Sequence, residues 1–312
     1  MTADGQSGQK GKNTGAARGS ILRRGYTLMH EHMTLDLSGI KKDEDCRLDC
    51  FAETVKELKE LYQYGVRNIL EVTNNGMGRD AAYIQAVSRE SGISILPCAG
   101  FYKEPFLPSW VRQKTAKELA EFMAKELEAG IDGGSLRAQA VGEVGTSRQE
   151  MKEEEKKILE AAAMAAAMTG APVTTHTTLG TMGREQAEFL IKRGVKPGKI
   201  VIGHMDLSQD MDVIFSVLDT GVNIGFDTVG KESYCPDSFR AKALKEIQDR
   251  GMISQVVLSM DITRKSHLKF RGGRGYSYLF TDFLPMLSAQ GVSGESIASM
   301  LIHTPGRILE RD

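Results

Sequence analysis

The sequence predicts a single (β/α)8 barrel, an α/β fold in which eight parallel strands alternate with helices. Short apolar runs rich in Val and Ile recur along the chain, as buried strands do. Between them lie longer segments with helical spacing of apolar residues and charged outer faces. A chain of 312 residues is long enough for such a barrel, which usually takes about 250 residues.

Eight apolar runs predict the strands. Gly or Pro marks the start of several of them: Gly25, Gly92 and Gly221 each precede a run, and Pro172 begins one. In chain order the predicted strands are 26–32, 68–74, 93–101, 138–145, 172–177, 200–206, 222–230 and 255–262.

Five segments between these runs predict helices. In the first, Val55, Leu58 and Leu61 repeat every three residues among Glu and Lys, which gives one apolar face. The predicted helices are 51–64, 116–129, 153–168, 184–192 and 239–250. The alternation of strands with helices implies right-handed crossovers and a parallel sheet.

An open, doubly wound sheet is the competing architecture. It binds its ligand at one switch point, whereas here polar residues end the first, fourth, fifth, sixth and eighth predicted strands. The closed barrel is therefore favoured. Residues 1–20 hold Gly, Ser, Lys and Asn without an apolar core and are expected to form a disordered tail, which leaves residues 21–312 for the barrel.

Composition excludes several classes of protein. A net charge of −1 argues against a general nucleic-acid binder, and no apolar stretch reaches the roughly 18 residues that a membrane span needs. Cys46, Cys50, Cys98 and Cys235 form no CxxC pair. We expect reduced thiols in a cytoplasmic protein that binds neither nucleic acid nor membrane.

Four of the six histidines stand at the ends of predicted strands. His30 and His32 are two residues apart, so on a strand their side chains point the same way, into the barrel mouth. His176 and His204 end the fifth and sixth strands. Each alone could be a hydrogen-bonded core histidine, but together they favour a metal site, because parallel strands deliver their last residues to one face.

Two carboxylates occupy apolar strands, where an unpaired charge would cost several kcal/mol. Glu143 lies in the fourth predicted strand and Asp261 in the eighth. A position between two cations would neutralise Glu143, and pairs of metal ions about 3.5–4 Å apart are typical of hydrolases. A buried ion pair with Arg or Lys is the alternative for both carboxylates.

Five motifs in order resemble those of the phosphotriesterase family of the amidohydrolase superfamily, and within it the homology-protein branch. The similarity extends over about residues 25–307. The motifs are Thr27-Leu28-Met29-His30-Glu31-His32, Gly142-Glu143-Val144-Gly145, Thr175-His176-Thr177, Gly203-His204-Met205-Asp206 and Leu258-Ser259-Met260-Asp261.

This resemblance implies two divalent metal ions, usually zinc. It implies that His30, His32 and Asp261 hold the buried ion, that His176 and His204 hold the more exposed one, and that Glu143 bridges them together with a hydroxide. The best-known family members bridge their metals with a carboxylated lysine instead, so their triesterase activity does not transfer directly to this chain. The family also tends to form homodimers.

We therefore expect a metal-dependent hydrolase, lactonase-like or phosphoesterase-like. The bridging hydroxide would attack a small-molecule ester or lactone, and Asp261 would act as the catalytic proton shuttle. Lys231, Arg264 and Lys265 follow the seventh and eighth strands, where barrels often bind phosphate, and suit an anionic carboxylate or phosphate substituent. A solvated basic loop is the alternative.

Tyr102 resembles a tyrosine that orients substrate in lactonases of the family. Asp206 and Asp227 are interpreted as carboxylates that orient ligands and loops. Two other functions stay open: amide hydrolysis or deamination at the same metal centre, and a non-catalytic metal-binding scaffold.

Overall fold

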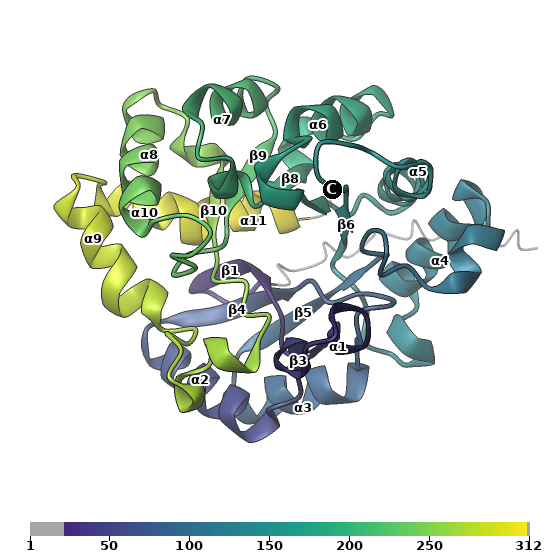
Figure 1. Ribbon diagram of the computed structural model, residues 1–312, viewed down its shortest axis with the longest axis horizontal. Helices are drawn as coiled ribbons and strands as arrows, with labels where there is room; N and C mark the ends of the chain where they lie inside the picture. The colour runs from purple at the N-terminus through teal and green to yellow at the C-terminus, as the bar shows by residue number, and fades with distance from the viewer. Residues whose placement is uncertain (1–21, 311–312) are drawn as a thin grey trace, which may run out of the picture.

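The computed structural model of the protein describes residues 22–310 and has the predicted barrel (Figure 1). Eight strands pair in the order β1-β4-β5-β6-β7-β8-β9-β10, each parallel to the next. They are β1 (Tyr26–Glu31), β4 (Val66–Glu71), β5 (Ser94–Ala99), β6 (Ala140–Gly145), β7 (Val173–His176), β8 (Ile200–Gly203), β9 (Asn223–Phe226) and β10 (Val256–Leu258). The predicted tail, residues 1–20, lies outside the described residues.

Several strands end earlier than the apolar runs predicted. β8 stops at Gly203 and β10 at Leu258, although the runs continue to residues 206 and 262. His204 and Asp261 have φ angles of 59° and 49°, in the left-handed region. The chain therefore turns out of the strand direction at or near these two residues, which are predicted metal ligands.

Side chains join the two outer strands of the sheet and close the barrel. Glu31, at the end of β1, is fully buried. Its two carboxylate oxygens accept the backbone N–H groups of Met260 and Ile262, at 2.6 and 3.2 Å, just beyond β10. The backbone N–H of His30 donates to Ser259 Oγ at 2.8 Å. This seam fixes β1 against the segment that carries Asp261.

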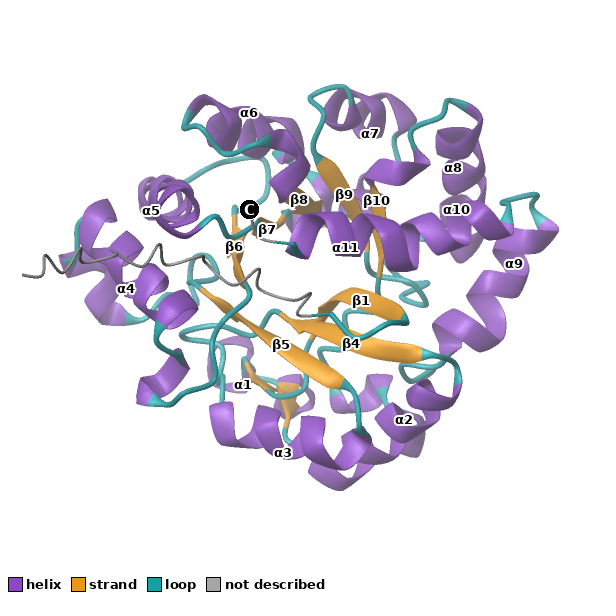
Figure 2. Cartoon of the chain, turned by 180° about the vertical axis from the view of Figure 1, so that it is seen from behind, coloured by secondary structure: helices purple, strands orange, loops and turns teal. Residues whose placement is uncertain are grey.

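Helices surround the strands (Figures 1 and 2). They are α2 (Phe51–Gln63), α3 (Ala81–Ser91), α4 (Ala116–Glu128), α5 (Glu153–Thr169), α6 (Gly183–Lys192), α7 (Met211–Leu218), α8 (Asp237–Asp249), α9 (Leu284–Ala289), α10 (Gly294–Ala298) and α11 (Thr304–Leu309). Apolar residues fill the space between helices and strands as one large core. Within residues 22–310, no helix is both long enough and apolar enough to span a bilayer.

Two further features frame the site. A small insertion after β1 comprises β2 (Leu35–Asp36), α1 (Ser38–Lys41) and β3 (Arg47–Leu48), with β2 and β3 antiparallel. Helix α11 covers the barrel on the side seen in Figure 2. Its Ile308 and Leu309 pack against barrel residues such as Met29 and Val257.

Candidate metal centre

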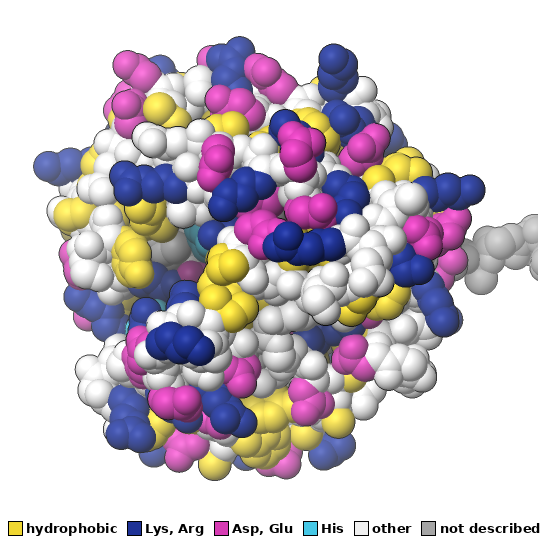
Figure 3. Space-filling model, turned by 45° about the vertical axis from the view of Figure 1, so that its right-hand side comes forward, with side chains coloured by type: hydrophobic (Ala, Val, Ile, Leu, Met, Phe, Trp, Pro, Cys, Tyr) yellow, Lys and Arg dark blue, Asp and Glu magenta, His cyan; other side chains and the backbone are white. Residues whose placement is uncertain are grey.

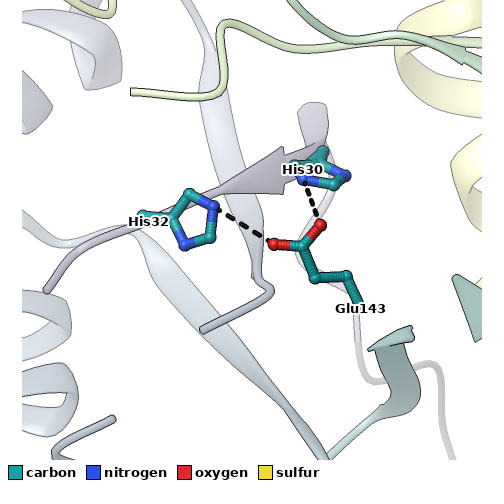
Figure 4. Close-up of side chains that lie close together, drawn as sticks. All are labelled: His30, His32 and Glu143. Atoms are coloured by element: carbon teal, nitrogen blue, oxygen red, sulfur yellow. Dashed lines mark ion pairs between the residues drawn. The ribbon is translucent and has the colours of Figure 1, made fainter. Parts of the chain in front are cut away.

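His30 of β1 and His32, just beyond its end, face a carboxylate delivered by β6 (Figure 4). His30 Nε2 lies 3.5 Å from Glu143 Oε2, and His32 Nε2 lies 3.6 Å from Glu143 Oε1. All three side chains are buried. Their ligand atoms lie within 4.8 Å of one another, which is the spacing of groups that could hold one metal ion.

His176, at the end of β7, and His204, just after β8, form a second group of candidate ligands with Glu143. His176 Nδ1 lies 3.2 Å from Glu143 Oε2 and 2.9 Å from His204 Nε2. The ligand atoms of Glu143, His176 and His204 also lie within 4.8 Å of one another. Glu143 thus belongs to two groups of candidate ligands, and its two carboxylate oxygens could contribute to both.

Asp261 completes the first group. Its Oδ1 lies 3.2 Å from His32 Nε2 and 3.8 Å from His30 Nε2. Its Oδ2 contacts the Lys231 ammonium. Asp261 is therefore positioned between the candidate ligands and a cation of the loop after β9.

Asp227, just beyond β9, orients two of the histidines. Its Oδ1 accepts the backbone N–H of His204 at 3.0 Å and lies 2.7 Å from His204 Nδ1. Its Oδ2 lies 3.4 Å from His30 Nδ1. A histidine that donates Nδ1–H to a carboxylate leaves its Nε2 lone pair for a metal.

Glycine makes room for this carboxylate. A Cβ at Gly225 would lie 2.1 Å from Asp227 Oδ2. A Cβ at Gly203 would lie 2.3 Å from the Thr175 carbonyl oxygen and 3.3 Å from Asp227 Oδ2. The glycines at these strand ends therefore allow Asp227 to reach the histidines.

Thr73 fixes the orientation of His32. The Thr73 hydroxyl donates to the Thr34 carbonyl at 2.8 Å, so its oxygen is the acceptor in the 2.7 Å contact with His32 Nδ1. His32 therefore donates Nδ1–H to Thr73 and directs Nε2 toward Glu143 and Asp261. Sequence reasoning missed Thr73, because nothing in the sequence pairs it with His32.

The carboxylates of the site are ionised and attract cations. Burial lowers the pKa of His30, but Asp227 and Glu143 outweigh it and raise that pKa to about 10, so binding of a metal ion would replace the proton of His30. Burial raises the pKa of Glu143, but His30 and His176 outweigh it and hold that pKa well below its usual value. Burial also raises the pKa of Asp261, but Lys231 and His32 outweigh burial and hold that pKa well below its usual value. Burial and the neighbouring His204 lower the pKa of His176 to about 4. Ionised carboxylates and a neutral imidazole are the forms that bind metals.

Unsatisfied atoms support the same conclusion. His30 Nε2, Glu143 Oε2 and Asp227 Oδ2 are buried and have no hydrogen-bond partner among the described residues. Such atoms carry a desolvation cost unless something binds them. His30 lies between the two carboxylates, with Nε2 3.5 Å from Glu143 Oε2 and Nδ1 3.4 Å from Asp227 Oδ2. The residues present therefore fit divalent metal ions.

A cavity of about 240 Å³ opens above the candidate ligands. In Figure 3 a hollow on this face shows histidine and acidic atoms, with Lys and Arg side chains beside it. Besides the candidate ligands, cations and apolar residues line it: Lys41, Lys103, Lys231, Arg264, Leu35, Leu37, Met77, Phe106, Leu179 and Leu207. The cavity thus combines cations with an apolar surface.

Three of the four predicted substrate residues line this cavity. The Tyr102 hydroxyl lies 3.2 Å from both ring nitrogens of His176. Arg264 is held by Asp43 of the insertion at 2.6 Å, and Lys231 contacts Asp261. Lys265 is not among the described lining residues; its ammonium lies 2.7 Å from Asp49.

His267 also lines the cavity, although its sequence position gave no reason to select it. Its Nδ1 accepts the backbone N–H of Thr263 at 3.3 Å. Burial lowers the pKa of His267 to about 4, with a smaller effect from Lys231 in the same direction. A neutral imidazole therefore stands beside Lys231 and Arg264.

The profile of the phosphotriesterase family matches residues 13–309 of the sequence. The chain belongs to the phosphotriesterase family. It is 44% identical over 286 residues to the phosphotriesterase homology protein of Escherichia coli, a match that covers 92% of this chain and 98% of that protein. The crystal structure of that protein, complexed with phosphate in the active site, superposes with a TM-score of 0.90 over 92% of this chain and 99% of that one.

Other members of the phosphotriesterase family act on different bonds, as their names state. The chain is 31% identical to the phospho-furanose lactonase of Mycoplasmopsis synoviae, over 83% of this chain and 80% of that protein. It is also 31% identical to the N-acetyltaurine hydrolase of Dictyostelium discoideum, over 82% of this chain and 72% of that protein. The predicted family is confirmed, and the named relatives include hydrolases of a lactone and of an amide.

Proposed function

We propose that the protein is a hydrolase with two divalent metal ions, zinc by preference, that cleaves a small ester or lactone bearing an anionic group. The observation that carries this proposal is the position of Glu143 between two groups of histidines. One group contains His30 and His32, and the other contains His176 and His204. When bound, the cations would lower the pKa of water and polarise the bond under attack.

The side chains of the protein have separate roles in this proposal. Asp261 would accept the proton of the attacking water and deliver it to the leaving group, because its Oδ1 faces the ligand cluster and its side chain lines the cavity. Tyr102 would orient the substrate beside His176. The apolar residues of the cavity would exclude water from the carbon skeleton.

Lys231 and Arg264 would bind the anionic group of the substrate. Both line the cavity and come from the loops after β9 and β10, the seventh and eighth barrel strands. Asp43 holds the Arg264 guanidinium in place, so little side-chain freedom remains to be lost on binding. Lys265 has no place in this proposal, because Asp49 holds it outside the cavity lining.

Amide hydrolysis is the second candidate reaction. The N-acetyltaurine hydrolases among the relatives favour it, and an activated water attacks an ester or an amide carbonyl in the same way. The anion site would be shared by both reactions. An amide nitrogen must be protonated before it leaves, so amide hydrolysis depends more strongly on the proton that Asp261 would deliver.

Metal content tests the centre. Protein purified without chelator and analysed by plasma emission should hold about two equivalents of metal. The Glu143→Gln variant keeps the side-chain size but loses the shared carboxylate, so it should hold one equivalent or less. Wild-type protein that takes up no stoichiometric metal, even after incubation with zinc, would contradict the proposal.

Turnover tests the reaction. Matched esters, lactones and amides with a phosphate or carboxylate substituent should include at least one substrate, and the best class identifies the bond cleaved. Asp261→Asn should lower kcat by at least about 100-fold, because general acid–base groups contribute roughly that much. An Asn variant that retains metal and normal kcat would remove Asp261 from the proposed mechanism.

A further inference from the structure

Lys103 stands on the side of the cavity opposite to Lys231. It follows β5, the third strand of the barrel, whereas Lys231 follows β9, the seventh. In a closed barrel of eight strands the third and seventh are diametrically opposed, and β5 and β9 lie on opposite sides of the molecule in Figures 1 and 2. Both lysines line the same cavity.

The stem of Lys103 is held against the wall of this cavity. A Cβ at Gly145, the last residue of β6, would lie 3.3 Å from Lys103 Cβ and 3.3 Å from Lys103 Cδ. Because Gly145 has no side chain, the aliphatic part of Lys103 can pack closely against it. Lys103 Nζ lies 5.6 Å from the ring centre of Tyr102 and 5.9 Å from that of Phe106. The Lys103 ammonium therefore lies near Tyr102, the residue proposed to orient the substrate.

No carboxylate of residues 22–310 lies within 4.0 Å of the Lys103 ammonium. Two arginines of other loops are paired: Arg79, after β4, with Glu126 and Asp132, and Arg264, after β10, with Asp43. Lys103 is half-buried, and burial lowers its pKa. Glu155 and Glu143 raise this pKa in part, and Lys41, which also lines the cavity, lowers it. Two ammonium groups that line one cavity, neither with a carboxylate within 4.0 Å among residues 22–310, would be stabilised by an anion from outside.

We propose that Lys103 and Lys41 form a second anion-binding subsite, so that the substrate carries one anionic group toward Lys231 and Arg264 and another toward Lys103, with the bond to be cleaved between them. This inference rests on the proposed function for the place of the scissile bond. It narrows the substrate class to short molecules with a carboxylate or phosphate at each end. A substrate with a single anionic group would leave one of the two groups of cationic side chains without an anion to bind.

Calorimetric titration with two simple anions tests the subsite without any turnover. Glutarate has two carboxylates and butyrate has one, on chains of similar length. Wild-type protein should bind glutarate at least about tenfold more tightly than butyrate, since one ion pair of this kind contributes about that factor. Lys103→Met should weaken glutarate binding by about tenfold and change butyrate binding less than twofold. Lys103→Arg should keep the preference for glutarate.

Lys117→Met is the matched control. Lys117 is an exposed lysine of α4 whose ammonium lies 3.9 Å from Glu121, and it does not line the cavity. Lys117→Met changes the net charge by the same amount as Lys103→Met. It should leave the affinities for glutarate and butyrate unchanged. Equal binding of the two anions by wild-type protein, or an equal change for both in Lys103→Met, would overturn the subsite. So would failure of glutarate to bind.

The outcomes separate this inference from the proposed function. A glutarate preference that depends on Lys103 would support the subsite even if no ester, lactone or amide were hydrolysed. Turnover of singly charged substrates by a protein whose Lys103→Met variant binds glutarate normally would support the hydrolase and remove the second subsite.

Discussion

Asp227 connects the two halves of the candidate metal centre through one carboxylate. One oxygen contacts His204 and the other approaches His30, which belong to different groups of ligands by resemblance to the family. His204 itself has a left-handed backbone, a conformation that costs on the order of 1–3 kcal/mol for a residue other than glycine. The bond from its backbone N–H to Asp227 helps to hold that conformation.

Asp227→Asn should weaken metal binding by about 10–100-fold, because an amide offers one acceptor oxygen where the carboxylate offers two. Both ions should be affected, since His30 and His204 lose their common partner. Competition with a chromogenic chelator measures the affinities. Asp282→Asn, at an exposed position, is the control. Wild-type affinity in Asp227→Asn would show that Asp227 does not orient the histidines.

At the scale of elements, α8 anchors the loops that follow β8 and β9. The fully buried Arg240 of α8 donates to Asp206 Oδ2 at 2.6 Å and to Asp237 Oδ1 at 2.7 Å. It also donates to Thr228 Oγ1 at 2.8 Å and to the Cys235 carbonyl at 2.6 Å. One guanidinium therefore holds both ends of the loop that carries Lys231.

Arg240→Met should lower the free energy of unfolding by about 3–5 kcal/mol, because it leaves two buried carboxylates without their cation. Urea denaturation measures this change. Arg184→Met is a suitable control, since Arg184 pairs with Glu188 at the exposed surface of α6 and should contribute little. A loss no larger than that of the control would mean that the buried network is not stabilising.

At the scale of the whole molecule, the barrel depends on the seam between β1 and the segment after β10. Glu31 accepts two backbone N–H groups across this seam, one on each oxygen. The seam lies beside the candidate ligands His30, His32 and Asp261. Barrel closure and the geometry of the first group of ligands are thus coupled.

Glu31→Gln should destabilise the protein by about 1–3 kcal/mol, because glutamine provides one acceptor oxygen and leaves one buried N–H unsatisfied. Thermal unfolding of the metal-free protein measures the effect without a contribution from bound ions. Glu295→Gln, at an exposed position near the start of α10, is the control. Identical melting temperatures for the wild type and Glu31→Gln would exclude a stabilising role for the seam.

The helices that the sequence did not predict have identifiable reasons. Helix α7 is short and mostly apolar, so it lacks the polar face that marks an amphipathic helix. Pro285 and Pro305 lie near the starts of α9 and α11, where proline is tolerated but interrupts the helical pattern in the sequence. Helix α3 buries only Ile84, Val87 and Ser91, so its apolar face is weak in the sequence.

The sequence by itself determined the barrel, its strand order and the family, because apolar runs with polar ends fix which side chains reach a common face. It also selected the six candidate ligands, which the structure brings together. Only the tertiary structure decided which loop cations face the cavity. Lys265 turns to Asp49 and Arg264 to Asp43, while Lys103 follows the space beside Gly145. The direction of a loop side chain depends on partners distant in the sequence, whereas the direction of a strand side chain follows from alternation along the strand.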